Sequence, residues 1–171
     1  PGRYQLIETS APEDYQQIKT DNDEEGEIVA EFTVARGTLD IKNITVGNNY
    51  YQNLDEVTQP IEIVNKEKGK GKFQVNKVDG SGSDLTGARF LLKDMESGQY
   101  VKTDGSLTTN TADALTNGDA TISYVELPTG EYELREFKSP SGYIRTINTW
   151  KVVVNEDGKT TITLDGNYDN D

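Results

Sequence analysis

The strongest constraint on the fold is an internal repeat. The segment PGRYQLIETSAPEDY at the start of the chain and the segment TGEYELREFKSPSGY near its end match without a gap, at one constant offset. The matching pairs are Gly2 and Gly130, Tyr4 and Tyr132, Leu6 and Leu134, Glu8 and Glu136, Pro12 and Pro140, and Tyr15 and Tyr143. A match of this kind indicates that one structural unit occurs twice in the chain.

The sequence that follows each copy also corresponds. EFTVARG and TLDIKNITVGN follow the first copy, whereas KVVVNEDG and KTTITLDGN follow the second. Only the first copy continues to PIEIVNKEKGKG. We therefore predict the back part of one module over residues 1–70 and most of a second module over residues 71–171, joined by the polar stretch NKEKGKGK. The alternative is a single larger β domain with two similar hairpins.

The residue pattern predicts an all-β chain. Stretches such as KFQVNKVDG, ARFLLKD and ATISYVELP are short, rich in β-formers and bounded by turn residues. The segment TTNTADALTNG is too short and too rich in Thr and Asn for more than one helical turn. We predict two tandem β-sandwich modules, the first without its N-terminal part and the second without its last strand.

Composition excludes several classes of function. The chain has no Cys and no His, so it can form no disulfide and no thiolate or imidazole metal site, and it implies no cofactor. Its net charge of -13 disfavours nucleic acid and anionic membranes as partners. No run is long and apolar enough to span a bilayer, so we expect no membrane insertion.

Several predicted strands end an apolar row on a polar side chain. Because side chains alternate between faces along a strand, residues two apart point the same way. The rows are Tyr132, Leu134 and Glu136; Phe73, Val75 and Lys77; and Ile61, Ile63 and Asn65. Each polar group could simply reach water at a strand end. Together, however, an ammonium, a carboxylate and an amide are complementary in reactivity.

Burial would favour a reaction between these groups. Desolvation lowers the pKa of a lysine and raises the pKa of a glutamic acid. A neutral amine is a nucleophile, and a protonated carboxyl can polarise an amide and carry protons to the leaving ammonia. The product would be an amide cross-link between two strands, and its formation would remove the buried charges.

These residues resemble a known family. KFQVNKVDGSGSDLTGARFLL, GDATISYVELPTGEYELREFKSPSGY and TWKVVVNEDGKTTITLDG are together similar to a Cna-B-type module of Gram-positive surface proteins and pilins. The resemblance covers nearly all of residues 71–171, and residues 1–65 match the back half of a similar module. It implies a prealbumin-like, or inverse immunoglobulin, β-sandwich with an intramolecular Lys–Asn isopeptide bond.

The resemblance also implies roles for individual residues. Lys77 matches the donor lysine and Glu136 the promoting glutamate of the second module, whereas Glu8 and Asn65 match the glutamate and the acceptor of the first. The first module's donor would lie before Pro1, and the second module's acceptor after Asp171. Other acceptors for Lys77 within the chain would be Asn155 or Asn167. The first copy departs from the family in reading APEDY where the family has Pro-x-Gly-Tyr.

The implied function is mechanical. We expect a stalk or backbone module of a cell-surface adhesin or pilus, extracellular and anchored to the cell wall outside this segment. Its partners would be neighbouring modules or subunits of the same fibre, and possible further partners include a host extracellular protein. The cross-linking would be a single-turnover modification rather than enzymatic turnover. The PIEIVN strand of one chain could also complete the open module of another.

Three other functions remain as alternatives. The first is an adhesin domain that binds a host protein or glycan without cross-link chemistry, with Tyr50 and Tyr51 of an exposed NNYYQN segment as its most suggestive patch. The second is a calcium-stabilised linker; its weak ligand candidates are Asp21, Asp23 and Glu25, with Glu27, Asp79 and Asp84 as further oxygen donors. The third, a glycosidase with paired carboxylates, has no motif to support it.

Overall fold

The computed structural model describes residues 1–17, 28–34, 36–37, 41–46, 49–57 and 64–167. The chain divides into two compact units, Pro1–Glu67 and Lys68–Asp171, here called unit 1 and unit 2. Apart from one short α-helix and one 3-10 turn, every described element is a β-strand, so the predicted all-β class is confirmed. No helix in the described part of the chain is long and apolar enough to cross a membrane.

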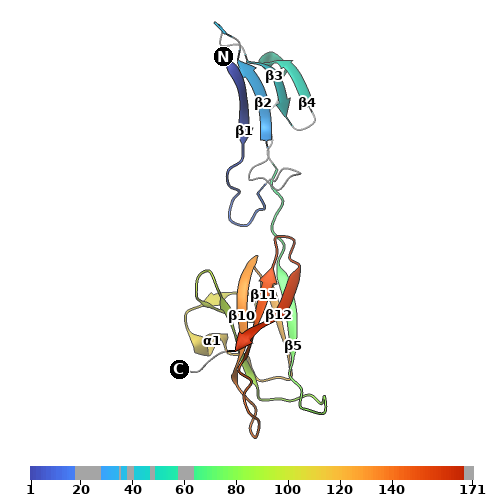
Figure 1. The fold of residues 1–171 in the computed structure, drawn as a ribbon, viewed down its shortest axis with the longest axis vertical. Helices are drawn as coiled ribbons and strands as arrows, with labels where there is room; N and C mark the ends of the chain where they lie inside the picture. Colours follow the sequence, from blue (N-terminus) through green and yellow to red (C-terminus); the bar gives the residue numbers. More distant parts are fainter. Residues whose placement is uncertain (18–27, 35, 38–40, 47–48, 58–63, 168–171) are drawn as a thin grey trace. The chain divides into compact units, whose positions relative to one another are not determined.

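Unit 1 contains a four-stranded antiparallel sheet (Figure 1). Its strands are β1 (Gly2–Ile7), β2 (Ile28–Val34), β3 (Ile41–Val46) and β4 (Asn49–Asn53), in that order, and the 3-10 turn η1 (Leu54–Glu56) follows. The NNYYQN segment is therefore largely strand, and Tyr50 is 63% exposed, as expected from the sequence. Tyr50 lies on β4 and its hydroxyl donates a hydrogen bond to Asn43 Oδ1 at 2.7 Å.

One face of the unit 1 sheet is only partly covered by described residues. Tyr4 stacks on Phe32 of the neighbouring strand with ring centroids 5.6 Å apart, yet Tyr4 and Leu6 are each 47% exposed. Ala30 and Ile44, on the inner strands, are buried. The apolar row of the first repeat copy therefore lies half open, in contrast to the matching row in unit 2.

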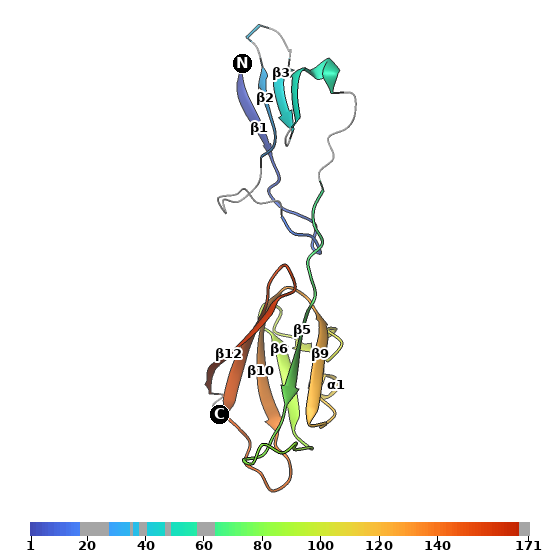
Figure 2. The same cartoon turned by 90° about the vertical axis from the view of Figure 1, so that its right-hand side faces the viewer.

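Unit 2 is a sandwich of a large and a small sheet. The large sheet has the order β12-β11-β10-β6-β7-β8, and the small sheet pairs β5 with β9. The strands are β5 (Gly71–Asn76), β6 (Arg89–Asp94), β7 (Tyr100–Val101), β8 (Leu107–Thr108), β9 (Thr121–Leu127), β10 (Gly130–Lys138), β11 (Asn148–Val154) and β12 (Thr160–Asn167). Figure 2 shows β5 and β9 crossing the face of the large sheet.

The core of unit 2 lies between these two sheets. Its central residues come from both layers: Phe73 and Tyr124 from the small sheet, and Leu92, Leu134 and Val152 from the large sheet. Tyr132, Leu134 and Glu136 are 3%, 4% and 3% exposed, so the inward row predicted for the second repeat copy is confirmed.

Two smaller predictions are also confirmed. The TTNTADALTNG segment forms a single helical turn, α1 (Thr111–Ala114), whose first turn is capped by Asn110 because its side chain accepts the N–H of Ala112 at 3.0 Å. After each repeat copy the chain forms a matching antiparallel pair of strands, β2 with β3 and β11 with β12.

Two buried tyrosines give a matched test of the core. Tyr124 Oη is buried without a hydrogen-bond partner among the described residues, whereas Tyr132 Oη donates to Pro128 O at 2.6 Å. An unpaired buried hydroxyl costs about 1–3 kcal/mol, and a hydrogen bond contributes about 1 kcal/mol. Tyr124→Phe should therefore raise the free energy of unfolding in urea by about 1 kcal/mol, whereas Tyr132→Phe should lower it. Equal losses for both variants would contradict this assignment.

The same residues predict a loss of stability at alkaline pH. Burial, with a smaller contribution from the Asp94 carboxylate, raises the pKa of Tyr132 from 10 to about 12. Burial also raises the pKa of Tyr124. Since the unfolded phenols ionise at lower pH, the folded state should lose this stabilisation as the pH rises from 10 to about 12. In Tyr132→Phe the urea midpoint of unfolding should fall less steeply with pH over that range than in the wild-type protein. An equal dependence on pH in both proteins would argue against the raised pKa of Tyr132.

Candidate functional site

The position of Lys77 is set by its backbone. The residue follows β5 directly, its N–H donates to Ala120 O at 2.8 Å, and its carbonyl accepts the N–H of Leu85 at 2.9 Å. Alternation along β5 places its side chain on the same row as Phe73 and Val75. The Lys77 side chain is 21% exposed, so most of it lies between the two sheets.

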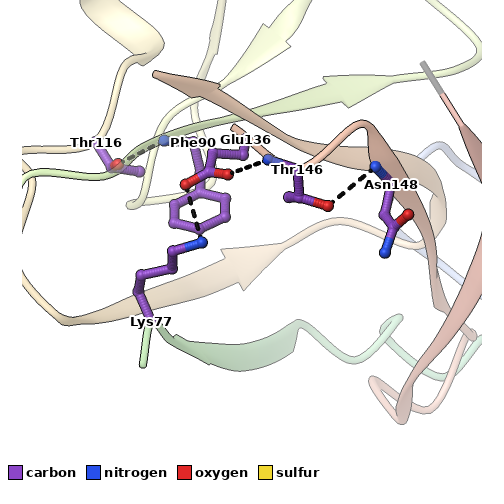
Figure 3. Close-up of polar contacts among 6 residues, drawn as sticks. All are labelled: Lys77, Phe90, Thr116, Glu136, Thr146 and Asn148. Carbon is purple, nitrogen blue, oxygen red and sulfur yellow. Dashed lines mark hydrogen bonds and ion pairs between the residues drawn. The ribbon is translucent and has the colours of Figure 1, made fainter. Parts of the chain in front are cut away.

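Glu136 faces Lys77 from the opposite sheet. It lies on β10 opposite Phe90 of β6, and its side chain has no solvent exposure. Glu136 Oε2 accepts the backbone N–H of Thr146 at 2.8 Å. Glu136 Oε1 is buried and accepts no hydrogen bond from described residues; it lies 3.1 Å from Lys77 Nζ, as Figure 3 shows. The structure thus brings the predicted donor and the predicted carboxylate into contact.

A buried polar network fixes the strand next to Glu136. Thr116 is 2% exposed, and its Oγ1 accepts the N–H of Phe90 at 2.9 Å while its own N–H donates to the Phe90 carbonyl at 3.3 Å. On the other side, Thr146 Oγ1 accepts the N–H of Asn148 at 3.2 Å (Figure 3). These contacts hold the backbone on both sides of the carboxylate. Sequence patterns had not indicated Thr116 or Thr146, because neither lies on a strand row.

A cavity of about 440 Å³ adjoins the ion pair. Val75 and Lys77 line one wall, and residues of the large sheet line the other. The large-sheet residues include Phe90, Leu134, Trp150 and Ile162. Ile162 is 43% exposed, so the cavity reaches the surface beside β5. Most of its exposed lining is apolar, with Lys77 among the polar lining residues, and such a lining disfavours charge.

Unit 1 holds the other predicted pair. Asn65 Nδ2 donates to Glu8 Oε1 at 2.8 Å and to Oε2 at 2.9 Å, and it also lies 3.2 Å from Gln16 O. Glu8 and Asn65 are both partly buried. The alternating row predicted to lead to Asn65 cannot be assessed, because Ile61 and Ile63 lie outside the described residues.

Each unit therefore holds part of the predicted set of amine, carboxylate and amide. In unit 2 an amine lies in contact with a carboxylate, whereas in unit 1 an amide lies in contact with the matching carboxylate. No Asn or Asp side chain contacts Lys77 Nζ among the described residues. Asn155 instead closes the turn between β11 and β12, where its Oδ1 accepts the N–H of Lys159 at 2.8 Å, and Asn167 pairs with Asn148.

The calcium candidates do not form a described site. Asp21, Asp23, Glu25 and Glu27 lie outside the described residues. Within the described part of the chain, no group of three or more acidic side chains is placed to hold a metal ion. Asp79 closes a turn instead, where its Oδ1 accepts the N–H groups of Ser81 and Ser83 at 2.8 and 3.0 Å.

Comparison with known proteins places the second unit in a family. The family model of the SpaA prealbumin-like fold domain matches residues 71–168. A search of the curated proteins gave no match.

Solved structures with resemblance to the chain come from bacterial pili. The pilus adhesin RrgA from Streptococcus pneumoniae is 25% identical, with 55% of this chain and 10% of that one covered and a TM-score of 0.43. The group B streptococcus pilus 2b backbone protein is also 25% identical. The match covers 77% of this chain and 43% of that one, with a TM-score of 0.43. A C-terminal fragment of the pilus adhesin SpaC from Lactobacillus rhamnosus GG is 19% identical. The match covers 98% of this chain and 48% of that one, with a TM-score of 0.43. The chain thus spans less than half the length of each of these proteins.

The contact between Lys77 and Glu136 can be measured by a double-mutant cycle. Lys77→Met and Glu136→Gln should each lower the free energy of unfolding by about 1–3 kcal/mol, because each leaves a desolvated partner unpaired. The double variant should lose less than the sum. A control cycle at the exposed pair of Lys151 and Glu131, 2.8 Å apart, should show coupling below about 1 kcal/mol. Additive losses at Lys77 and Glu136 would show that the two groups do not interact.

Proposed function

The chain belongs to the family of SpaA prealbumin-like fold domains, and on this basis we propose that it is a structural module of a Gram-positive cell-surface adhesin or pilus that forms internal Lys–Asn amide cross-links. The observation that carries the proposal is the 3.1 Å contact between Lys77 Nζ and the fully buried Glu136 carboxylate. The Glu136 side chain has no solvent exposure, and a buried pair has a reaction available that removes both charges.

The chemical step in unit 2 would use Lys77 as nucleophile. Transfer of a proton from Nζ to Glu136 leaves a neutral amine, which attacks the side-chain carbonyl carbon of an Asn brought into the cavity. A C–N bond forms, the bond between that carbon and the Asn nitrogen breaks, and Glu136 gives its proton to the departing nitrogen. The carboxylate then takes the second proton that the lysine nitrogen loses as it becomes an amide, so Glu136 ends neutral. The products are one amide cross-link and one ammonia.

In unit 1 the same step would use Asn65 as acceptor and Glu8 as the carboxylate. The two hydrogen bonds from Asn65 Nδ2 to Glu8, at 2.8 and 2.9 Å, place the nitrogen that would leave as ammonia against the group that would protonate it. The contact with Gln16 O holds the amide in one orientation. This arrangement supports the assignment of Asn65 as acceptor.

Such cross-links suit a load-bearing protein. By analogy with disulfides, a covalent loop closure stabilises the folded state by about 3–5 kcal/mol through the entropy of the unfolded chain. The covalent bond also limits how far the chain can be extended under load, because it does not break as hydrogen bonds do. The module would lie outside the cell, its partners would be neighbouring modules or subunits of the same fibre, and the reaction would occur once per site without turnover.

Peptide mapping of the protein recovered from the cell surface would test this function. We expect a branched peptide in which Lys77 is joined to an Asn with the loss of one ammonia, and a second branched peptide at Asn65. Glu136→Gln should abolish the Lys77 product and leave the Asn65 product. The control Glu131→Gln, on the same strand and also facing a lysine, should leave both. An unmodified Lys77 in the wild-type protein would rule out the cross-link.

A further inference from the structure

The turn before β9 contains Asn117 and Gly118, the only Asn–Gly dipeptide in the sequence. Asn117 is exposed to solvent. Gly118 has a φ of 92°, a left-handed conformation that favours glycine, so the turn itself requires this residue. Because glycine has no side chain, the nitrogen of the peptide bond that joins the two residues is open to approach. The dipeptide thus combines a side-chain amide with an unhindered peptide nitrogen.

The Asn117 side chain is folded over this peptide bond. Its Oδ1 accepts the N–H of Asp119 at 3.1 Å, and its Nδ2 donates to Asp119 Oδ2 at 2.5 Å. The ring that the first bond closes contains Gly118 N, so the side-chain carbonyl carbon is folded toward that nitrogen. The second bond places a carboxylate against the amide nitrogen, which is the group that would leave if the carbon were attacked.

The Gly118 N–H is not engaged elsewhere in the structure. Among the residues that the structure describes, none accepts a hydrogen bond from it. Glycines in two other turns differ from Gly118 in this respect. Gly105 donates its N–H to Lys102 O at 3.0 Å, and Gly158 donates its N–H to Asn155 O at 2.9 Å. A nitrogen whose proton is held by a carbonyl is a poorer nucleophile, so Gly118 is the most reactive of the three.

We propose that Asn117 is a site of spontaneous covalent modification, in which Gly118 N attacks the side-chain carbonyl carbon of Asn117 and forms a cyclic imide. The bond between that carbon and Asn117 Nδ2 breaks. Asp119 carries the proton of the Gly118 N–H to the departing nitrogen, which leaves as ammonia. Water then opens the imide at either carbonyl and gives aspartate or isoaspartate at position 117. Water is the only co-reactant, so the reaction does not depend on the cross-link.

The modification would alter the contacts between this turn and β6. Thr116 accepts the N–H of Phe90 at 2.9 Å and donates its own N–H to the Phe90 carbonyl at 3.3 Å (Figure 3). On the other side of the reacting residue, Gly118 O accepts the N–H of Gly87 at 2.7 Å. Isoaspartate lengthens the main chain between these two anchors, so they cannot both keep their geometry. Phe90 pairs with Glu136 in the sheet, so the change would reach the strand beside the buried carboxylate.

Asn155 provides a matched control in the same unit. It is also exposed, and its Oδ1 accepts the N–H of Asp157 at 3.1 Å, so its side chain makes the same kind of turn. The residue after it is Glu156, whose side chain hinders approach to the peptide nitrogen. Asn155 should therefore remain unmodified under conditions that convert Asn117.

Tryptic mapping of the purified chain would test the reaction. The protein would be kept in mildly alkaline buffer made with water enriched in heavy oxygen, and then digested in ordinary water. The peptide of residues 103–135 should first lose one ammonia and then take up one labelled water, whereas the peptide of residues 152–159 should stay unlabelled. Asp119→Ala keeps the backbone N–H of the turn but removes the carboxylate. It should slow the conversion at least about tenfold, the low end of general acid–base catalysis.

Amide hydrogen exchange would test the effect on β6. The converted protein gains a negative charge, so ion exchange separates it from the unconverted protein. Exchange at Gly87 or Phe90 should become up to about tenfold faster in the isoaspartate form, the equivalent of one lost hydrogen bond. Asn117→Asp adds the same charge without lengthening the main chain and should leave both amides unchanged.

The outcomes are distinct from those of the cross-link. Cross-linking at Lys77 also releases one ammonia, but it joins two peptides and takes up no water, whereas the reaction at Asn117 leaves one linear peptide. Absence of label in the peptide of residues 103–135, or equal labelling at Asn155, would overturn the modification site. Equal rates in Asp119→Ala and the wild-type protein would overturn the role of Asp119 as proton carrier.

Discussion

A carboxylate without solvent exposure needs polar partners that replace water, and unit 2 provides such partners for Glu136. Alternation along β10 directs the side chain inward after Tyr132 and Leu134, so the strand that buries the apolar row also buries the charge. One oxygen receives the N–H of Thr146 and the other faces Lys77. Because an unpaired buried charge costs several kcal/mol, the end of β5 and the loop after β10 are both constrained to meet at this point.

The two copies of the repeat show complementary contacts of the matching carboxylate. In unit 2 the Glu136 carboxylate contacts an ammonium, and in unit 1 the matching Glu8 carboxylate contacts an amide. A carboxylate that can face either group is what a proton carrier between amine and amide requires. Between them the two units show an amine, a carboxylate and an amide, and neither shows all three in contact among its described residues.

The sequence predicted those parts of the structure that follow from local periodicity. The all-β class, the inward row ending at Glu136 and the single helical turn are confirmed, and so is the prealbumin-like fold over residues 71–168. The contacts of Thr116 and Thr146 were missed because they come from loops packed against strands, and loop conformation has no period. The strand β4 within NNYYQN was also not predicted, since polar residues at a sheet edge resemble a turn. The tandem arrangement and the roles of Lys77, Glu136, Glu8 and Asn65 stay predictions.

The position of Lys77 in the chain bears on how a module would carry load. Force applied along the polypeptide enters unit 2 through β5, its first strand, and reaches Lys77 before any residue of the large sheet. An amide bond at Lys77 would pass that force directly to the segment that carries the acceptor. The hydrogen bonds of β6, β10 and β11, and the core they enclose, would then lie outside the loaded path. A cross-link later in the sequence would leave the first strand free to separate, so a cross-link at the end of β5 would protect most of the fold with one bond.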